Sequence, residues 1–308
     1  MPVTVVGSIA FDAVKTPFGE HERMLGGAAV HFALAASFFD EVRIVGPVGD
    51  DFGESELNVL RRRRIDVSGI EHIAGGRTFF WRGEYGWDLN TRETLDTQLG
   101  VFEQFEPKLS ATARSSDVVF LANIQPDLQR AVRKQCRHTR FAALDSMNLW
   151  IEVARDSLIE AINAVDCLIL NDAELRQLAG KPSVVAAARE ILSWGPPGRR
   201  AVVAKLGEYG AALITADGYF SIPAFPLETV VDPTGAGDSF AGGFVGYIAA
   251  QAGDKPLTPN VLRRAMAYGT AIASFNVQEF GTDRVARLRM DEIDERVVDL
   301  RQMTAFST

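Results

Sequence analysis

Stretches of four to eight apolar residues recur along the chain, and segments of helical length separate them. The apolar stretches are rich in Val, Ile and Leu and nearly continuous, which is typical of parallel strands buried on both faces. We predict strands at residues 3–9, 42–49, 117–123, 141–145, 167–171 and 201–207. We predict helices at residues 27–39, 52–64, 126–138, 151–163, 172–180, 184–194, 237–251, 258–276 and 290–303. This alternation predicts an α/β fold with a mostly parallel central sheet.

Residues 76–98 break this rhythm, because polar and apolar positions alternate there without a helical period. Phe79, Trp81 and Tyr85 fall on one face of the predicted strand, where they either pack within the protein or stack on a base or sugar. Together with residues 11–25, this segment predicts a small β-sheet that covers the main sheet as a lid. No repeat or Pro/Ser-rich linker divides the chain, so we expect residues 1–308 to form a single domain with this lid.

The charge balance narrows the classes of partner. The chain has 308 residues with 32 Lys and Arg against 40 Asp and Glu, a net charge of −8. Nucleic acid requires a basic surface, so we expect no nucleic-acid partner, and the basic run at residues 61–64 is interpreted as a solvated helix end. The sequence contains no run of about 18 uncharged apolar residues, so we predict no membrane span. The first residues predict a strand rather than a signal peptide, and Cys136 and Cys167 lack metal-binding spacing, so we expect a cytoplasmic protein.

Polar and Gly-rich segments follow the predicted strands, at the edge where parallel sheets bind ligands. The most informative segment is residues 232–243, a Gly-rich turn that leads into an apolar helix. Backbone N–H groups of Gly235, Ala236 and Gly237 at a helix N-terminus favour a phosphate group. Asp238 follows directly and would repel that phosphate unless it had a function, such as taking a proton from an attacking hydroxyl group.

Other phosphate-binding patterns are absent from the sequence. No GxxxxGK[ST] segment occurs, which excludes a Walker-type loop, and no GxGxxG follows the first predicted strand, so we expect no dinucleotide cofactor. The histidines also lack the spacing of a zinc site.

Residues 232–244, DPTGAGDSFAGGF, closely resemble the C-terminal signature of the ribokinase-like (PfkB) family of carbohydrate kinases. Other segments resemble family landmarks in the same order: GSIAFD at 7–12, LGGAAVHFALAASFF at 25–39, VGDDFGESELNVLRRRRIDVSGI at 48–70, NDAEL at 171–175 and KLGEYGA at 205–211. The resemblance covers nearly the whole chain. It implies a ribokinase-like three-layer α/β/α domain with a β-sheet lid, and ATP-dependent phosphorylation of an alcohol.

The resemblance also implies roles for individual residues. Asp238 would be the general base, and Gly235, Ala236 and Gly237 would form the anion hole. Residues expected on the acceptor side, from the resemblance or from their place after a strand or in the lid, are Asp12, Gly26, Gly27, His31, Trp81, Asn123 and Asp145. Residues expected to bind the Mg·ATP cofactor are Asn171, Glu174, Lys205, Gly207, Gly210 and Asn276, with Glu174 acting on Mg²⁺ through water. Asp232 resembles the acidic position of the family's monovalent-cation loop, and these residues leave open whether K⁺ binds.

The acceptor is less defined than the reaction. His31 stands where ribose-binding members usually have Asn, so ribose itself is not indicated. We expect a small sugar or sugar-like acceptor, with a nucleoside kinase of the same family as the alternative. A non-catalytic sugar- or nucleotide-binding protein of this fold is disfavoured, because Asp238 and the GAG turn are both present. A small sheet is marginal alone, so we expect a homodimer formed through the lid.

Overall fold

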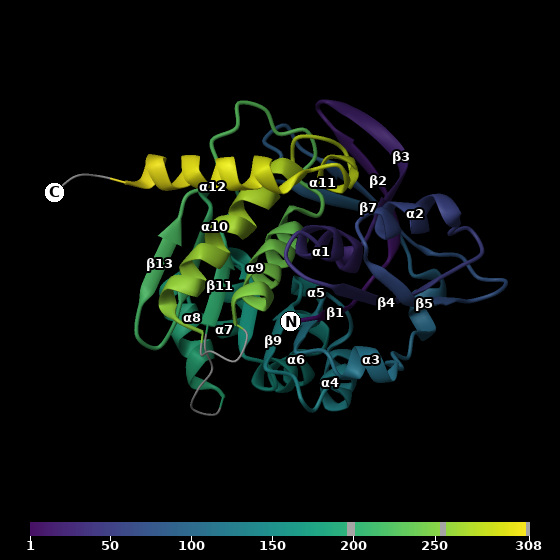
Figure 1. Cartoon of the computed structure of the whole chain (residues 1–308), viewed down its shortest axis with the longest axis horizontal. Coiled ribbons are helices and arrows are strands. Elements are labelled where there is room, and N and C mark those ends of the chain that lie inside the picture. The colour runs from purple at the N-terminus through teal and green to yellow at the C-terminus, as the bar shows by residue number, and fades with distance from the viewer. Residues whose placement is uncertain (196–200, 253–256, 306–308) are drawn as a thin grey trace.

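The computed structural model describes residues 1–195, 201–252 and 257–305, and within these residues the central sheet has nine strands (Figure 1). Their order across the sheet is β13-β12-β11-β10-β9-β8-β1-β4-β5. The strands are β1 (Val3–Val6), β4 (Val42–Val48), β5 (Asp66–His72), β8 (Val118–Leu121), β9 (Phe141–Asp145), β10 (Cys167–Asn171), β11 (Ala201–Lys205), β12 (Ala211–Ile214) and β13 (Tyr219–Ile222).

Neighbouring strands from β5 to β11 pair in parallel, whereas β12 and β13 form an antiparallel hairpin at one edge. The predicted mostly parallel sheet is therefore confirmed. The first strand is shorter than predicted, because the chain leaves the sheet after Val6 and enters a second sheet at Ala10. The strands of the hairpin have four residues each, too few to show a clear period of their own.

Helices cover both faces of the sheet. Successive side chains of a strand point to opposite faces, and those of β1 and β8 are all buried. Val5 points into one core and Val6 into the other. The first core is completed by α1 (Ala28–Ala36), α2 (Glu54–Arg62), α9 (Ala236–Ala252), α10 (Pro259–Asn276), α11 (Asp283–Ala286) and α12 (Met290–Thr304). The second is completed by α3 (Ala111–Arg114), α4 (Pro126–Gln135), α5 (Asn148–Val153), α6 (Arg155–Asn163), α7 (Asp172–Ala179) and α8 (Val184–Ser193). The predicted three-layer α/β/α fold is confirmed.

One helix prediction is wrong in its boundaries. Residues 151–163, predicted as a single helix, belong to two helices, α5 and α6. Ala154 separates them with a backbone conformation of φ −142° and ψ 35°, which a continuous helix does not permit. Two short 3₁₀ helices, η1 (Gly100–Gln104) and η2 (Gly207–Tyr209), were not predicted.

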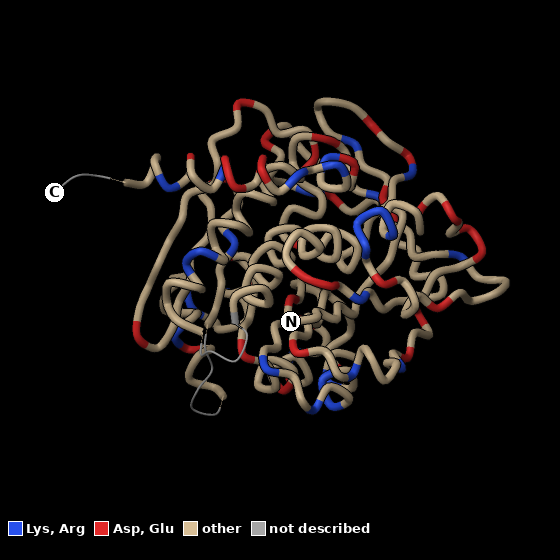
Figure 2. The backbone as a smooth tube through the Cα atoms, viewed as in Figure 1, with Lys and Arg blue, Asp and Glu red and all other residues tan. Residues whose placement is uncertain are grey.

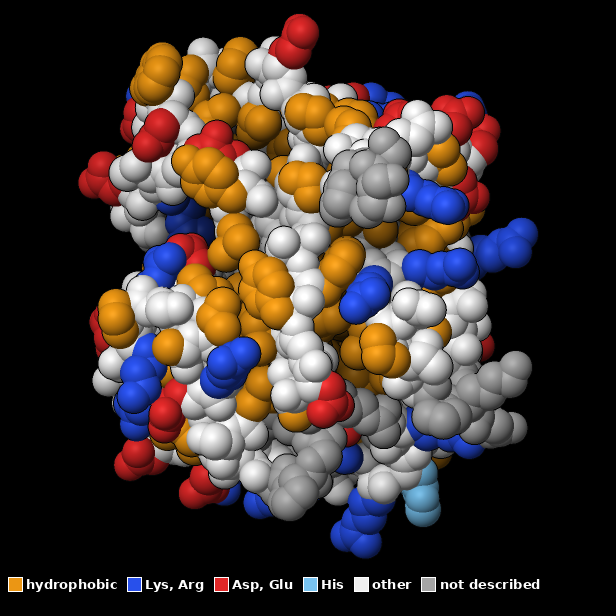
Figure 3. All heavy atoms as spheres, turned by 90° about the vertical axis from the view of Figure 1, so that its left-hand side faces the viewer, with side chains coloured by type: hydrophobic (Ala, Val, Ile, Leu, Met, Phe, Trp, Pro, Cys, Tyr) orange, Lys and Arg blue, Asp and Glu red, His pale blue; other side chains and the backbone are white. Residues whose placement is uncertain are grey.

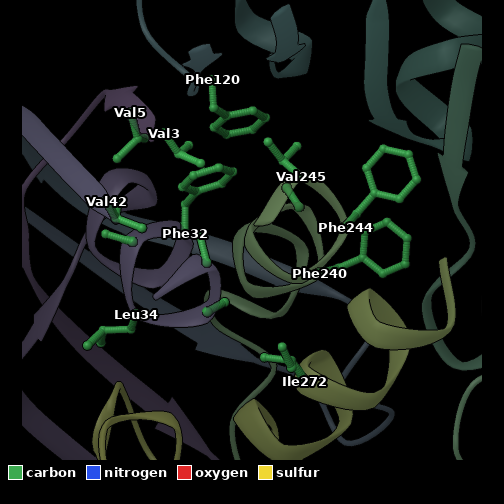
Figure 4. Packing of buried hydrophobic residues seen from close by; sticks show 14 of the residues in the cluster. Val3, Val5, Phe32, Leu34, Val42, Phe120, Phe240, Phe244, Val245 and Ile272 are labelled. Atoms are coloured by element: carbon green, nitrogen blue, oxygen red, sulfur yellow. The ribbon is translucent and has the colours of Figure 1, made fainter. Parts of the chain in front are cut away.

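Close packing of α1 against α9 positions the Gly-rich turn that precedes α9. Phe32 of α1 stacks on Phe120 of β8 with ring centroids 4.1 Å apart, and both lie in the first core (Figure 4). A Cβ atom on Gly242 of α9 would lie 2.4 Å from the carbonyl oxygen of Phe32. Only glycine permits this approach, so the packing fixes α9 and the turn at its N-terminus.

The lid is a separate four-stranded sheet in the order β3-β2-β6-β7. Its strands are β2 (Ala10–Thr16), β3 (Gly19–Gly26), β6 (Phe79–Tyr85) and β7 (Arg92–Gln98). β2 and β6 pair in parallel, and the two outer pairs are antiparallel. Both predicted lid segments therefore take part in this second sheet, at the upper right of Figure 1. The division of the chain into one domain with a lid stays a prediction.

The molecular surface fits the acidic, mixed charge of the sequence. Figure 2 shows acidic and basic residues interspersed along the backbone, with a run of basic residues at the end of α2. On the side that carries β13, apolar side chains lie between basic ones (Figure 3). Among the helices that the structure describes, none has both the length and the apolar character needed to cross a membrane.

Candidate active site

The Gly-rich turn lies directly before α9, and Asp238 lies in the first turn of that helix. Gly235 has a φ of +73°, and a Cβ atom there would lie 2.2 Å from Nδ1 of His31. The imidazole of His31 therefore packs against the underside of the turn, and no other residue fits at position 235. The N–H groups at this helix N-terminus form a site suited to an anion.

Asn276 connects the residues beneath the turn. Its Nδ2 donates to the carbonyl oxygen of Thr234 at 2.7 Å, and its Oδ1 accepts from Oγ of Ser239 at 2.9 Å. Nδ1 of His31 lies 3.2 Å from the same Oδ1, and burial lowers the pKa of His31 to about 4, so the ring is neutral. Both side chains are buried, and the contacts predicted for them, His31 to the acceptor and Asn276 to the nucleotide, stay predictions.

Three acidic side chains and a lysine lie close enough to Asp238 to interact with it electrostatically. They are Asp145 at the end of β9, Glu174 in α7, Asp12 in the lid and Lys205 at the end of β11. Nζ of Lys205 lies 2.8 Å from Oδ2 of Asp145, and this ion pair is largely buried, with exposed side-chain fractions of 19% and 5%. Nζ also lies 2.9 Å from where a Cβ atom of Gly237 would be, directly beside the anion turn. The pKa values of the Asp12, Glu174 and Asp238 carboxyls are raised in this cluster.

Burial is the main cause of the altered ionisation in this cluster. It raises the pKa of the Asp238 carboxyl to about 7, and the negative charge of Asp145 adds to this effect while Lys205 opposes it. Burial also raises the pKa of Glu174 to about 7. A carboxylate with a pKa near neutrality is suited to accept a proton, which is what the sequence predicts for Asp238.

Asn171 and Glu174 form the capping box of α7. Oδ1 of Asn171 accepts from the N–H of Glu174 at 2.8 Å, and Oε2 of Glu174 accepts from the N–H of Asn171 at 2.9 Å. The predicted NxxE pair therefore has a structural function as a helix cap. The cap holds the Glu174 carboxylate near Lys205 and Asp145, whose charges act on its pKa.

The residues Asp12, Gly26 and Gly27, which the sequence predicts on the acceptor side, lie where the chain passes between the main sheet and the lid. Asp12 of β2 is buried, its carboxylate accepts a hydrogen bond from the N–H of Gly27, and burial raises its pKa to about 7. A Cβ atom on Gly26 would lie 2.0 Å from Oδ2 of Asp12, so glycine is required there. Trp81 of β6 pairs with Asp12 in the lid, which places both side chains on the same face of that sheet.

Two further lid residues, Tyr85 and Arg92, interact with the site. Oγ1 of Thr234, in the Gly-rich turn, donates to the hydroxyl oxygen of Tyr85 at 3.2 Å. Arg92 pairs with Tyr85 across β6 and β7, and its positive charge lowers the pKa values of Asp12, Glu174 and Asp238 relative to what burial alone gives. Only the strand pairing reveals Arg92, because the sequence shows it as one exposed arginine in an alternating segment.

The turn that follows β11 comes directly after Lys205, which lies beside the anion turn. Gly207 and Gly210 have φ values of +60° and +99°, and a Cβ atom on Gly210 would lie 2.1 Å from the carbonyl oxygen of Ile222. Both glycines are thus required by the backbone. Asn123 lies after β8, where its Oδ1 accepts from Nε1 of Trp150 at 3.0 Å. A direct contact between Asn123 and a substrate stays a prediction.

Asp232 is completely buried beneath the loop that follows α10. Its carboxylate oxygens accept from the N–H groups of Thr234 and Gly281, both at 2.9 Å. Among the described residues no lysine or arginine forms an ion pair with Asp232. Burial accordingly raises the pKa of this carboxyl.

Sugar and nucleoside kinases are among the solved structures that have a similar fold. The nucleoside kinase of Methanocaldococcus jannaschii superposes with a TM-score of 0.78 at 20% identity, covering 97% of this chain and 98% of that one. The nucleoside kinase of Burkholderia thailandensis in complex with ADP-inosine superposes with a TM-score of 0.79 at 19% identity, covering 97% and 95%. At such low identity these similarities show the fold alone. The chain therefore has the ribokinase-like fold.

The sequence comparisons identify the family. The model of the pfkB family of carbohydrate kinases matches residues 3–287, and the chain belongs to this family. The cytidine kinase of Thermococcus kodakarensis is 30% identical over 256 residues, covering 80% of this chain and 88% of that protein. The nucleoside kinase of Methanothermobacter thermautotrophicus is 28% identical over 303 residues, covering 90% and 89%. The chain is therefore a kinase that phosphorylates a hydroxyl group of a sugar or nucleoside.

Proposed function

We propose that this kinase transfers the γ-phosphoryl group of ATP to a hydroxyl group with Asp238 as general base. The observation that carries the proposal is the place of the half-buried Asp238 carboxyl in the first turn of α9, directly beside the anion turn, with a pKa raised to about 7. Asp238 takes the proton of the acceptor hydroxyl as the new P–O bond forms and the bond to ADP breaks. The N–H groups of the turn stabilise the charge on the phosphoryl oxygens.

Mg²⁺ fits the acidic cluster as a water-held ion. The described residues contain no group of three His, Cys, Asp or Glu side chains that holds a metal ion directly. Mg²⁺ usually keeps several waters and binds proteins through one or two carboxylates together with substrate phosphates. We assign Glu174 to this shell, and the ion supplies charge neutralisation on the phosphates when bound. We assign Lys205 and the glycines at 207 and 210 to the border of the triphosphate, because Nζ of Lys205 lies beside the anion turn and the two glycines form the turn that follows β11.

A monovalent cation such as K⁺ suits the loop around Asp232. A buried carboxylate without an ion-pair partner among the described residues is unfavourable unless a cation compensates its charge. The carbonyl groups of the loop at residues 277–281 are nearby, because the N–H of Gly281 binds Asp232. We propose this loop as the monovalent-cation site.

We propose a nucleoside as the acceptor, with a small sugar as the second candidate. The similarity to the cytidine and nucleoside kinases described above supports a nucleoside acceptor. Trp81, on the lid face that also carries Asp12, offers a ring on which a base could stack. A small sugar is favoured by a different observation. The Trp81 ring already packs over Gly83 and donates from Nε1 to Thr94 at 3.3 Å, while a similar fructokinase and ribokinase act without a base to stack.

The test is a panel of nucleosides and sugars with Mg·ATP, measured as ADP release, with the Asp238→Asn variant in parallel. We expect one class of acceptor to stimulate ADP release. Asp238→Asn retains the size of the side chain but cannot accept the proton, so turnover should fall about 10²–10⁴-fold while nucleotide affinity changes little. A variant with more than half of the wild-type rate would refute the assignment of the base.

We also propose a cytoplasmic homodimer that associates through the lid. The face of the lid opposite Trp81 carries the ion pair Lys15–Glu84 at 2.8 Å, and Arg82 lies 3.9 Å from Glu20. A lid-to-lid contact would thus be polar and sensitive to salt. Phe79, on the same strand as Trp81, contacts Phe102 of its own chain with ring centroids 5.8 Å apart, so it is not free to form the interface.

A further inference from the structure

The far end of the lid hairpin contacts two loops of the main domain. At the end of β6, the hydroxyl of Tyr85 accepts from Oγ1 of Thr234 at 3.2 Å. Five residues later, Nδ2 of Asn90 donates to Oε1 of Glu208 at 3.2 Å. Asn90 also covers Gly207, since its Oδ1 lies 3.6 Å from where a Cβ atom of that glycine would be. The hairpin end therefore spans from one loop to the other.

These two loops are the walls assigned to the triphosphate. Thr234 precedes the anion turn at 235–237, and Glu208 lies within the turn at 207–210. Arg92, the first residue after the hairpin end, acts electrostatically on the same acidic cluster. A segment fixed to both walls must lie above the space between them. The hairpin end thus lies over the place where the phosphates would bind.

The hairpin end holds its own shape, so it moves as a unit. Oδ1 of Asp88 accepts from the N–H groups of Asn90 and Thr91 at 3.1 and 3.0 Å, and its Oδ2 accepts from Oγ1 of Thr91 at 3.1 Å. The N–H of Gly86 donates to the carbonyl oxygen of Thr91 at 2.9 Å and closes the loop. Residues 86–91, which we call the lid tip, are therefore held together by their own hydrogen bonds, and Asn90 projects from a defined support.

We propose that the lid tip is a roof over the donor phosphates, and that the Asn90–Glu208 hydrogen bond must break for ATP to enter and for ADP to leave. The proposal rests on the proposed function, because that function assigns the two walls to the triphosphate. Asn90 and Glu208 are positioning residues in this arrangement, since they act by holding the lid and not by touching the reacting atoms. The roof makes opening of the lid a step in product release.

The strength of the Asn90–Glu208 contact is tested by exchanging its donor and acceptor. Asn90→Asp places a second carboxylate against Glu208 and should open the roof. Glu208→Gln preserves a hydrogen bond with Asn90. The double variant Asn90→Asp/Glu208→Gln restores the bond with its direction reversed. Asn58→Asp, an equally exposed asparagine on α2, is the matched control for the added charge.

The readout is release of a fluorescent ADP analogue, mant-ADP, from the Mg²⁺-containing wild-type and variant proteins in a stopped-flow chase with unlabelled ADP. Asn90→Asp should release mant-ADP about 3–10-fold faster, the range that the loss of one ordinary hydrogen bond gives for this solvent-exposed pair. Hydrolysis of ATP without an acceptor should rise in the same variant, because the phosphates are less shielded from water. Glu208→Gln, the double variant and the control should stay within about twofold of wild type.

Two results would overturn the roof. Either Asn90→Asp releases mant-ADP at the wild-type rate, or the double variant is as fast as Asn90→Asp alone, which would show that the effect does not pass through this contact. Failure of the proposed function has a different signature, because the wild-type protein would then not bind mant-ADP at all. A melting curve for each variant confirms that rates are compared between folded proteins.

Discussion

Asp12 illustrates how a single residue at the site weakens the fold. Burial raises the pKa of its carboxyl from 3.8 to about 7. Between these two pH values the folded protein binds more protons than the unfolded chain. The free energy of unfolding contributed by Asp12 is therefore highest below pH 3.8 and falls as the pH rises toward 7. At neutral pH the ionised, buried Asp12 destabilises the fold. We propose that it is retained because it binds the acceptor.

Asp12→Asn should consequently stabilise the protein above pH 7, since the amide has no charge to bury. The rise of the Asp12 pKa to about 7 corresponds to on the order of 2–4 kcal/mol, of which the weaker hydrogen bond from Gly27 removes a part. We expect the melting temperature to rise by about 2–6 °C at pH 8 and by little at pH 4. Scanning calorimetry at the two pH values measures this difference. An equal change at both values would mean that ionisation of Asp12 is not the cause.

Glu174→Gln tests the metal shell at the same scale. The amide retains an oxygen for the helix cap of α7 but removes the negative charge beside the phosphates. The Mg²⁺ concentration that gives half-maximal turnover should rise several-fold, while the KM of the acceptor stays near its wild-type value. The measurement is a Mg²⁺ titration of the rate at saturating acceptor. An unchanged titration would leave Glu174 with the capping function only.

At the scale of elements, the turn before α9 depends on glycine for two separate reasons. Gly235 has a φ of +73°, and a Cβ atom would overlap His31. Gly75 has a similar φ of +77°, but nothing lies within 4 Å of its Cβ position. Comparing alanine at the two positions separates backbone strain from steric overlap.

We expect Gly75→Ala to lower the free energy of unfolding by about 1–2 kcal/mol with full activity, since only its backbone conformation is unfavourable. Gly235→Ala should lower it further and reduce turnover by at least about 100-fold, because the turn must move away from His31. Urea unfolding and steady-state rates measure both effects. Equal loss of stability in the two variants would show that the overlap with His31 adds nothing to the cost of the backbone conformation.

The elements differ in how well the sequence predicts them. Six strands of the central sheet and most helices follow from periodicity, whereas β5, β12 and β13 were not predicted from it. The turn with Asp238 is visible because all its residues are contiguous. Arg92 and Asn90 were not predicted as parts of the site. They reach it through strand pairing and a contact with Glu208, 118 positions away, and an alternating segment does not specify its partner. The break at Ala154 was also missed, because helical periodicity continues on both sides of it.

At the scale of the whole molecule, the proposed homodimer is tested by sedimentation velocity. We expect a species of twice 33.6 kDa at about 10 µM that dissociates as salt is raised, since the outer face of the lid is ionic. Phe79→Asp should mainly reduce thermal stability, because the ring packs on Phe102 of the same chain. A monomer at low salt and micromolar concentration would exclude association through the lid.

The order of strands in the two sheets also determines when the molecule can fold. β1 lies between β4 and β8, and β2 of the lid pairs with β6, so the first strands wait for partners far along the chain. A ribosome must synthesise residues up to 121 before β1 is paired on both sides. Until then, the most apolar strand near the N-terminus exposes an open edge to other nascent chains. The nascent chain is thus prone to aggregate while its first 120 residues are being synthesised, and slow translation of these residues would lengthen that period.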